Sequence, residues 1–91
     1  MRITIELGSD HELTQEQFDS LNTKMQELAD NDNVEFVMED HSTRDGGDYY
    51  LIFKDDIGME LKAFAWLISD IHISIKTCLG AEFNDWWASY E

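Results

Sequence analysis

Apolar and polar residues alternate along four segments of the chain, and this period of two is typical of strands with one buried side. In the first segment, Ile3, Ile5 and Leu7 share one side while Arg2, Thr4 and Glu6 share the other. The four segments that show this alternation are Arg2–Leu7, Val34–His41, Tyr49–Phe53 and Ile71–Ile75. The pattern therefore predicts four strands.

Three further segments carry apolar residues at helical spacing. The first helix is expected to begin with a capping box, with Thr14 at the N-cap and Gln17 three positions later, and to end at the polar run 30–33. A second helix is expected from Asp55 or Asp56 to about Ser69. A short final helix is expected over 81–91, because four aromatic residues recur there at helical spacing: Phe83, Trp86, Trp87 and Tyr90.

The second and third predicted strands are joined by a tight hairpin. Asp-Gly is a strong signal for a two-residue turn, and Asp45-Gly46 stands between the two strands. With this loop, Met38 lies opposite Phe53. The apolar residues of both strands then share one face, so the turn and the apolar pattern agree.

The resulting order, β-α-β-β-α-β, predicts an α+β fold of the ferredoxin-like type. We expect a single domain spanning 1–91, with a four-stranded antiparallel sheet and two helices on one face. The C-terminal helix is expected to fold over the other face of the sheet. The alternative is that its aromatic residues form a homodimer or partner contact, through Phe83, Trp86, Trp87 and Tyr90.

Charge narrows the classes of function. The 91 residues include 20 Asp and Glu against 6 Lys and Arg, for a net charge of −14. Such a charge opposes direct binding to nucleic acid or to an anionic membrane and favours a basic partner. It also exceeds the magnitude of about 2 to 8 that solubility of a small domain requires. No apolar run reaches the length of a membrane helix and no signal peptide is evident, so we expect a cytoplasmic protein.

The sequence offers little evidence for catalysis, a metal or a cofactor. The histidines at 11, 41 and 72 are scattered. The loop beginning at Asp30 fails as a calcium site, because Glu35 stands where Gly is needed and His41 where Glu is needed. The lone Cys78 has no histidine at a telling spacing. We therefore expect no enzyme, metal or cofactor.

The carboxylates gather at the two ends of the predicted sheet. The preferred candidate for partner binding is the hairpin end, which carries Asp10, Glu12, Asp40, Asp45 and Asp48. The second candidate is the opposite end, which carries Asp30, Asp32, Asp55 and Asp56. Loops that are acidic only for solubility and helix capping are the competing explanation.

In size, α+β order and acidity, the chain resembles small phage-encoded inhibitors such as anti-CRISPR and DNA-mimic proteins. That resemblance implies an inhibitor that occupies the basic, nucleic-acid-binding surface of a partner protein in the cytoplasm of the host cell. An immunity or antitoxin-like protein that neutralises a basic nuclease uses the same physics. A small enzyme or ligand-binding module remains the third class, since the fold alone does not decide function.

Overall fold

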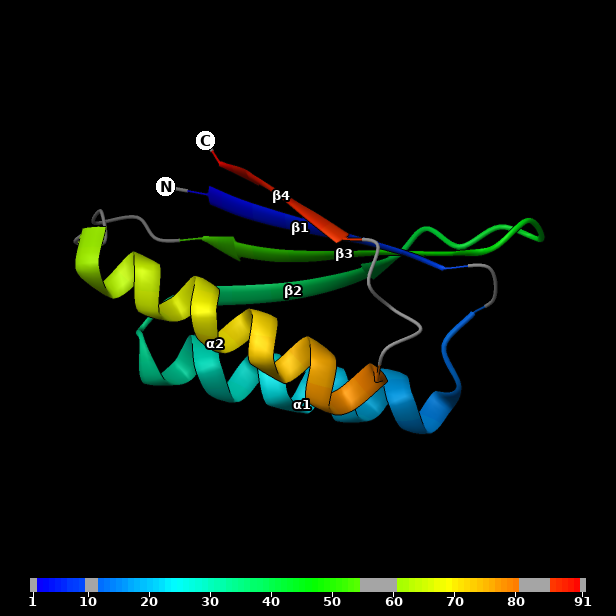
Figure 1. Ribbon diagram of the computed structural model, residues 1–91, viewed down its shortest axis with the longest axis horizontal. Coiled ribbons are helices and arrows are strands. Elements are labelled where there is room, and N and C mark those ends of the chain that lie inside the picture. Colours follow the sequence, from blue (N-terminus) through cyan, green and yellow to red (C-terminus); the bar gives the residue numbers. More distant parts are fainter. Residues whose placement is uncertain (1, 10–11, 55–60, 81–85, 91) are drawn as a thin grey trace.

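The computed structural model describes residues 2–9, 12–54, 61–80 and 86–90. The elements follow the order β1 (Arg2–Ser9), α1 (Gln15–Asn31), β2 (Glu35–Asp40), β3 (Gly47–Lys54), α2 (Leu61–Leu79) and β4 (Trp86–Tyr90). The strands form one antiparallel sheet in the order β2-β3-β1-β4. Both helices lie on the same side of this sheet (Figure 1). The predicted α+β class, with a four-stranded antiparallel sheet and two helices, is confirmed.

Helix α1 has the ends that its sequence predicts. The Thr14 hydroxyl accepts from the Gln17 backbone N–H at 3.1 Å, and the Gln17 side chain accepts from the Thr14 N–H at 3.0 Å. At the other end, Asn33 takes a left-handed φ of 57°. The next residue, Val34, then donates its N–H back to the Ala29 carbonyl at 2.9 Å. This closing turn is a Schellman motif, which lets the chain reverse directly into β2.

The prediction of a strand over Ile71–Ile75 is wrong, because these residues lie inside α2. Ile71 and Ile75 are fully buried, and with Leu67 and Leu79 they form a stripe with a spacing of four residues. Ile73, between them, is 60% exposed. Alternation and helical spacing coincide at positions i and i+4, so Ile71 and Ile75 fit both patterns. The helix ends at Gly80, which has a φ of +76° and donates its N–H to the Lys76 carbonyl.

The prediction of a C-terminal helix is also wrong. Trp86–Tyr90 forms β4, which pairs with β1 so that Ala88 lies opposite Ile5 and Trp87 opposite Glu6. Tryptophan and tyrosine favour strands over helices. Phe83, the first residue of the predicted aromatic stripe, lies outside the described residues. The fourth strand is therefore supplied by the segment that was predicted to cover the sheet.

The hairpin between β2 and β3 is shifted by two residues from the prediction. Met38 lies opposite Leu51 instead of Phe53, and Asp40 lies opposite Tyr49. The bridge between Thr43 and Gly46 closes the loop around 44–45 instead of 45–46. Because side chains alternate with a period of two, this shift leaves every residue on its predicted face.

The core lies between the sheet and the helices. Strands β1 and β3 contribute their buried side, and the helices contribute their apolar stripes, so a single cluster connects all the layers. Its largest fully buried members are Tyr49, Phe53, Ile5, Leu7, Leu21, Met25, Leu51, Leu67, Ile71 and Ile75. The rings of Phe36 and Phe53 pack at 4.9 Å across β2 and β3.

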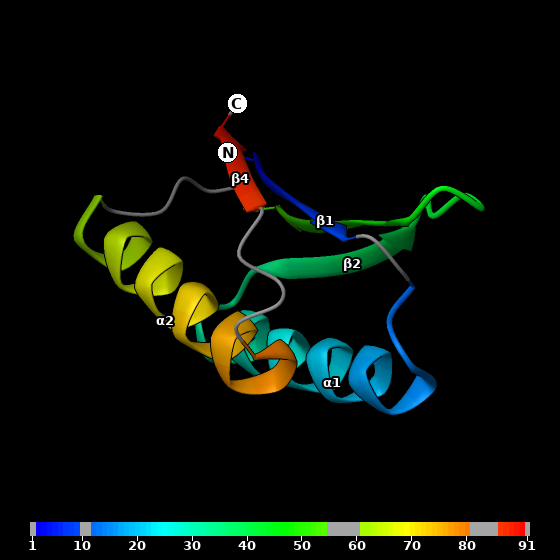
Figure 2. The same ribbon diagram turned by 45° about the vertical axis from the view of Figure 1, so that its right-hand side comes forward.

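The other side of the sheet, which we call the open face, points away from both helices (Figure 2). Among the described residues, no helix lies over it. Its members from the first three strands in sheet order, β2, β3 and β1, are Glu35, Val37, Glu39, Asp48, Tyr50, Ile52, Lys54, Arg2, Thr4 and Glu6.

Candidate functional site

The hairpin end of the sheet is organised around the buried Tyr49. This residue lies opposite Leu7 on β1 and Asp40 on β2. Its hydroxyl oxygen accepts from the Leu13 backbone N–H at 2.8 Å, which ties the segment before α1 to β3. Since Glu12 precedes Leu13 and Asp48 precedes Tyr49, the structure brings these two carboxylate residues to the same end of the sheet as Asp40.

Asp40 is held in position by the start of the hairpin loop. Its Oδ1 accepts from the Ser42 backbone N–H at 2.9 Å, and the Ser42 hydroxyl in turn accepts from the Asp48 N–H at 3.0 Å. Hydrogen bonding from Ser42 lowers the pKa of the Asp40 carboxyl, with a further lowering from nearby His41. Asp40 therefore remains a fixed negative charge at neutral pH.

Asp45 occupies the exposed hairpin loop, where its backbone N–H donates to the Thr43 hydroxyl at 3.2 Å. Asp10 lies outside the described residues. Of the candidates at the hairpin end, the structure thus gathers Glu12, Asp40 and Asp48 and places Asp45 at the tip.

The second candidate end is described only in part. Asp30 is exposed in the last turn of α1, where its Oδ1 accepts from the Gln26 side chain at 3.0 Å. Asp32 is the C-cap of the same helix, and its N–H donates to the Leu28 carbonyl. Asp55 and Asp56 lie outside the described residues. Asp30 and Asp32 both participate in the end of the helix, which is a structural use of these residues.

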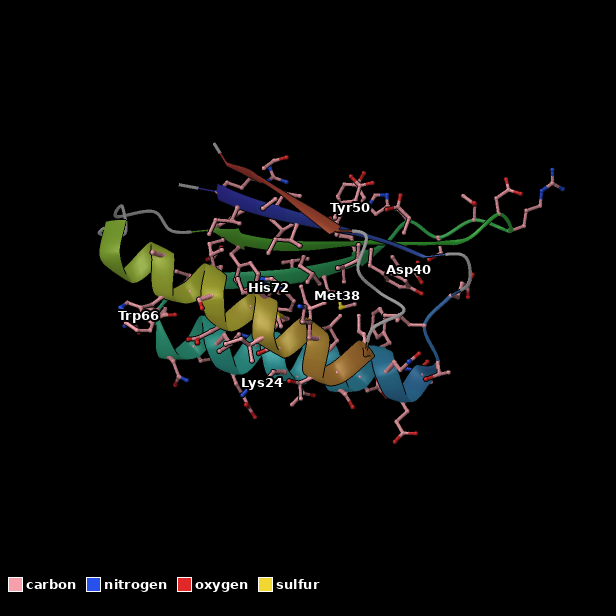
Figure 3. The ribbon with its side chains drawn as sticks, in the orientation of Figure 1. Lys24, Met38, Asp40, Tyr50, Trp66 and His72 are labelled. Carbon is pink, nitrogen blue, oxygen red and sulfur yellow. The ribbon has the colours of Figure 1, made fainter. Side chains whose placement is uncertain are left out.

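The open face carries a second group of carboxylates, of which only Asp48 is among the predicted binding residues. Across three strands, Glu6 lies opposite Tyr50, and Tyr50 lies opposite Glu39. Tyr50 points away from the helices, whereas Met38 lies on the helix side of the sheet (Figure 3). Asp48 precedes this row on β3. We call Glu6, Glu39 and Asp48 the open-face acids.

Two of the open-face acids, Glu6 and Asp48, are crowded against one another. Glu6 lies close to both the Asp48 carboxyl and the Tyr50 hydroxyl. Partial burial, and then the neighbouring charge of Asp48, raises the pKa of Glu6 above its usual range. Burial together with Glu6 and Asp48 raises the pKa of Tyr50 as well. A cation placed here would relieve the repulsion between the carboxylates.

A histidine borders this group. His41 Nε2 lies 3.0 Å from Glu39 Oε1, and the His41 ring stacks on Tyr50 with centroids 4.4 Å apart. The strand register alone brings Glu6, Tyr50 and Glu39 into one row. The row can therefore be predicted only when the pairing of β1 with β3 is known.

The described residues give no support to metal or nucleophilic chemistry. No group of three or more His, Cys, Asp or Glu residues in the described ranges is arranged to hold a metal ion. Cys78 borders a shallow hollow of about 460 Å³ between α1 and α2. Burial raises the pKa of the Cys78 thiol, and nearby Lys24 offsets this only in part. The thiol form is favoured, whereas a nucleophile requires the thiolate.

No protein-family model matches the sequence, and no curated protein matches it. Among solved structures, the fold is similar to the de novo designed protein Foldit4, with a TM-score of 0.70 and 14% identity over 99% of this chain and 96% of that one. It is also similar to the de novo designed protein Ferredog-Diesel, with a TM-score of 0.65 and 11% identity over 99% of this chain and 85% of that one.

The likeness to the two designed proteins concerns the fold alone, because the identities are low. Within the described residues, neither helix is long and apolar enough to cross a membrane.

Proposed function

We propose that this chain is a non-enzymatic acidic binding protein that occupies a basic, nucleic-acid-binding surface of a partner protein, in the manner of anti-CRISPR and DNA-mimic inhibitors. The observation that carries the proposal is that Glu12, Asp40 and Asp48 lie at one end of the sheet, next to Tyr49 or to its partner Leu13 in the chain or across the strands, with Asp45 at the hairpin tip. Carboxylates in such an array can pair with Arg and Lys side chains that otherwise receive phosphates. The protein would act in the cytoplasm.

The net charge of −14 supports the same proposal. Excess charge of one sign destabilises a compact chain, so it is a cost that a solubility requirement alone does not explain. Long-range attraction to a basic partner increases the association rate, and salt screens it over about 8 Å at physiological ionic strength. Binding is therefore expected to weaken as salt rises.

The proposal includes a ferredoxin-like assignment of the fold. Its support is the strand order β2-β3-β1-β4 with both helices on one side. In this arrangement the two segments that join a strand to a following helix leave opposite ends of the sheet. That separation is what creates two distinct acidic ends.

The test is competition with nucleic acid. Purified basic nucleic-acid-binding proteins, each loaded with a fluorescent duplex, are titrated with this protein, and displacement is read by anisotropy. Asp40→Asn, Asp45→Asn and Asp48→Asn are combined in one variant, because asparagine keeps the oxygen that accepts from Ser42. A matched variant combines Asp30→Asn, Asp32→Asn and Asp56→Asn, so both lose the same charge.

We expect the first variant to displace the duplex at least about tenfold more weakly than the matched variant. If only the matched variant is weakened, the binding end is the opposite one. Failure of the unaltered protein to displace any duplex at low salt contradicts the proposal. Circular dichroism of each variant checks that the fold is retained.

A further inference from the structure

The open face is a sheet surface that neither described helix covers, and its chemistry changes along the strands. One row contains Arg2, Lys54 and Glu35, which lie opposite one another on β1, β3 and β2. The next row contains Thr4, Ile52 and Val37 in the same strand order. The row nearest the hairpin contains Glu6, Tyr50 and Glu39, with Asp48 beyond it on β3.

The middle row supplies apolar contact. Val37 is 52% exposed, although it lies beside Ile52, which is only 5% exposed. Val37 is one of three large hydrophobic residues that are exposed among the described residues. Tyr50, in the neighbouring row, is half-buried and presents its ring on the same side. The apolar patch is small, so it can add to a charged contact but cannot replace it.

The charges decide what kind of partner fits. Glu6 and Glu39 flank Tyr50 on its two neighbouring strands, about 10 Å apart by the usual strand spacing. Asp48 adds a third carboxylate, and the crowding of Glu6 against Asp48 favours a nearby cation. A guanidinium group suits this place, because its planar set of N–H donors pairs with carboxylates.

Other occupants fit less well. A second copy of this chain would bring two bodies of charge −14 together, and nucleic acid or an anionic membrane would add like charge. Arg2 and Lys54 lie at the far end of the face, so they do not neutralise the acids next to Tyr50.

From these observations we infer that the open face is a docking surface for a partner segment that carries arginine or lysine next to apolar side chains. The basic groups bind among Glu6, Glu39 and Asp48, and an apolar side chain packs on Val37 and Tyr50. This inference rests on the proposed function and specifies a contact surface for it beyond the hairpin loop.

An extended segment can satisfy both requirements. In a strand, side chains at i and i+2 lie on one side, about 7 Å apart. The rows of the open face are separated by the same two-residue step, since Glu6 and Thr4 are two positions apart on β1. A segment running along the strands therefore places a basic residue on the acids and an apolar residue on Val37.

The test uses a synthetic peptide with Arg-Ser-Val-Ser repeats, in which arginine and valine share one side when extended. It is titrated into isotope-labelled protein at low salt, and amide shifts are followed by NMR. A second peptide with Arg-Ser-Ser-Ser repeats keeps the charge without the apolar groups. The variants are Glu39→Lys, Val37→Thr and, as a matched charge control on exposed α1, Glu27→Lys.

We expect the largest shifts at Thr4, Val37, Tyr50 and Ile52. Glu39→Lys should weaken binding of the first peptide about tenfold more than Glu27→Lys does. Val37→Thr should weaken the first peptide about threefold and leave the second unchanged.

Two results would overturn the inference in different ways. In the first, the peptide binds, but its shifts are confined to the hairpin loop 43–46 or to the exposed Trp66 and Ile73 on α2, and Glu39→Lys and Glu27→Lys have equal effects. This result contradicts docking on the open face and leaves the proposed function standing. In the second, neither peptide shows saturable binding at low salt, and the protein displaces no nucleic acid from basic proteins. This result contradicts both the docking surface and the proposed function.

Discussion

At the scale of single residues, Glu6 is the group whose environment most clearly costs the protein stability. Its pKa is raised by partial burial and by Asp48, so the folded state binds its proton more tightly than the unfolded chain does. Glu6 therefore destabilises the fold when ionised at neutral pH, and this cost is relieved as pH falls through the raised pKa towards 4.5. Asp40 behaves oppositely, because its lowered pKa gives stability that is present above 3.8 and is lost as pH falls through the lowered value.

We predict that Glu6→Gln stabilises the protein at pH 7. Glutamine keeps the shape of the side chain and removes the charge that faces Asp48. Because Glu6 is half-buried and its charge is screened, the gain should be about 0.5 kcal/mol. Urea unfolding at pH 7 and pH 4 measures it, and the gain should fade at the lower pH.

The control for this prediction is Glu35→Gln on the same face. Glu35 lies opposite Lys54, and an opposite-charge pair across strands is mildly favourable. Its substitution should therefore leave stability unchanged or slightly lower it. An equal gain from both variants would show that the effect comes from total charge and not from Asp48.

At the scale of elements, α2 offers a direct test of helix against strand. In a strand, Ile71, Ile73 and Ile75 would share one side, so truncating any of them would cost a similar amount. In the observed helix, Ile75 is fully buried and Ile73 is 60% exposed. We predict that Ile75→Ala costs about 2 to 5 kcal/mol, whereas Ile73→Ala changes stability by less than about 0.5 kcal/mol. Chemical denaturation of the two variants measures the difference, and equal losses would refute the helix.

Local signals predicted β1, α1, β2 and β3 well, because each has one dominant period and α1 has its own caps. The prediction for the second half of the chain is wrong where the strand period and the helix period coincide. Ile71 and Ile75 fit both a strand and a helix, and only the continuation to Leu67 and Leu79 distinguishes them. Once Ile71–Ile75 was assigned as the fourth strand, the aromatic segment at 86–90 had no strand position left.

The candidate site shows the same division. The hairpin-end acids could be predicted, because topology alone places Glu12, Asp40 and Asp48 together. Of the open-face acids, Glu6 and Glu39 could not be predicted, because they become neighbours of Tyr50 only through the pairing of three strands. A two-residue error in the hairpin register keeps the faces but changes every cross-strand partner.

At the scale of the whole molecule, the net charge acts over the entire body. The radius of gyration is 12.8 Å, while the screening length is about 30 Å at 0.01 M salt and about 3 Å at 1 M. At low salt, each carboxylate therefore repels those across the molecule. At high salt, only near neighbours still interact.

We predict that sodium chloride raises the melting temperature between about 0.01 and 1 M, by about 5 °C if screening restores about 1 kcal/mol. Thermal unfolding followed by circular dichroism measures it. A variant with Glu16→Gln, Glu27→Gln and Asp70→Asn, all at exposed positions, should show a smaller rise. A fall in melting temperature with salt would mean that attractive pairs such as Lys24–Glu27 dominate.

The pairing of Ile3 with Tyr90 has a practical consequence for handling the protein. It brings the start of β1 and the end of β4 side by side, at the end of the sheet away from the hairpin (Figure 1). From Ile3 to Ser9, β1 then extends about 20 Å towards the hairpin end. A tag or surface tether fused next to either strand end is thereby held a strand's length from the acidic tip. The same proximity allows a short glycine-rich linker to join the two strand ends, with new termini opened at the 44–45 loop. The resulting circular permutant has a cut hairpin but keeps every strand pairing of the sheet.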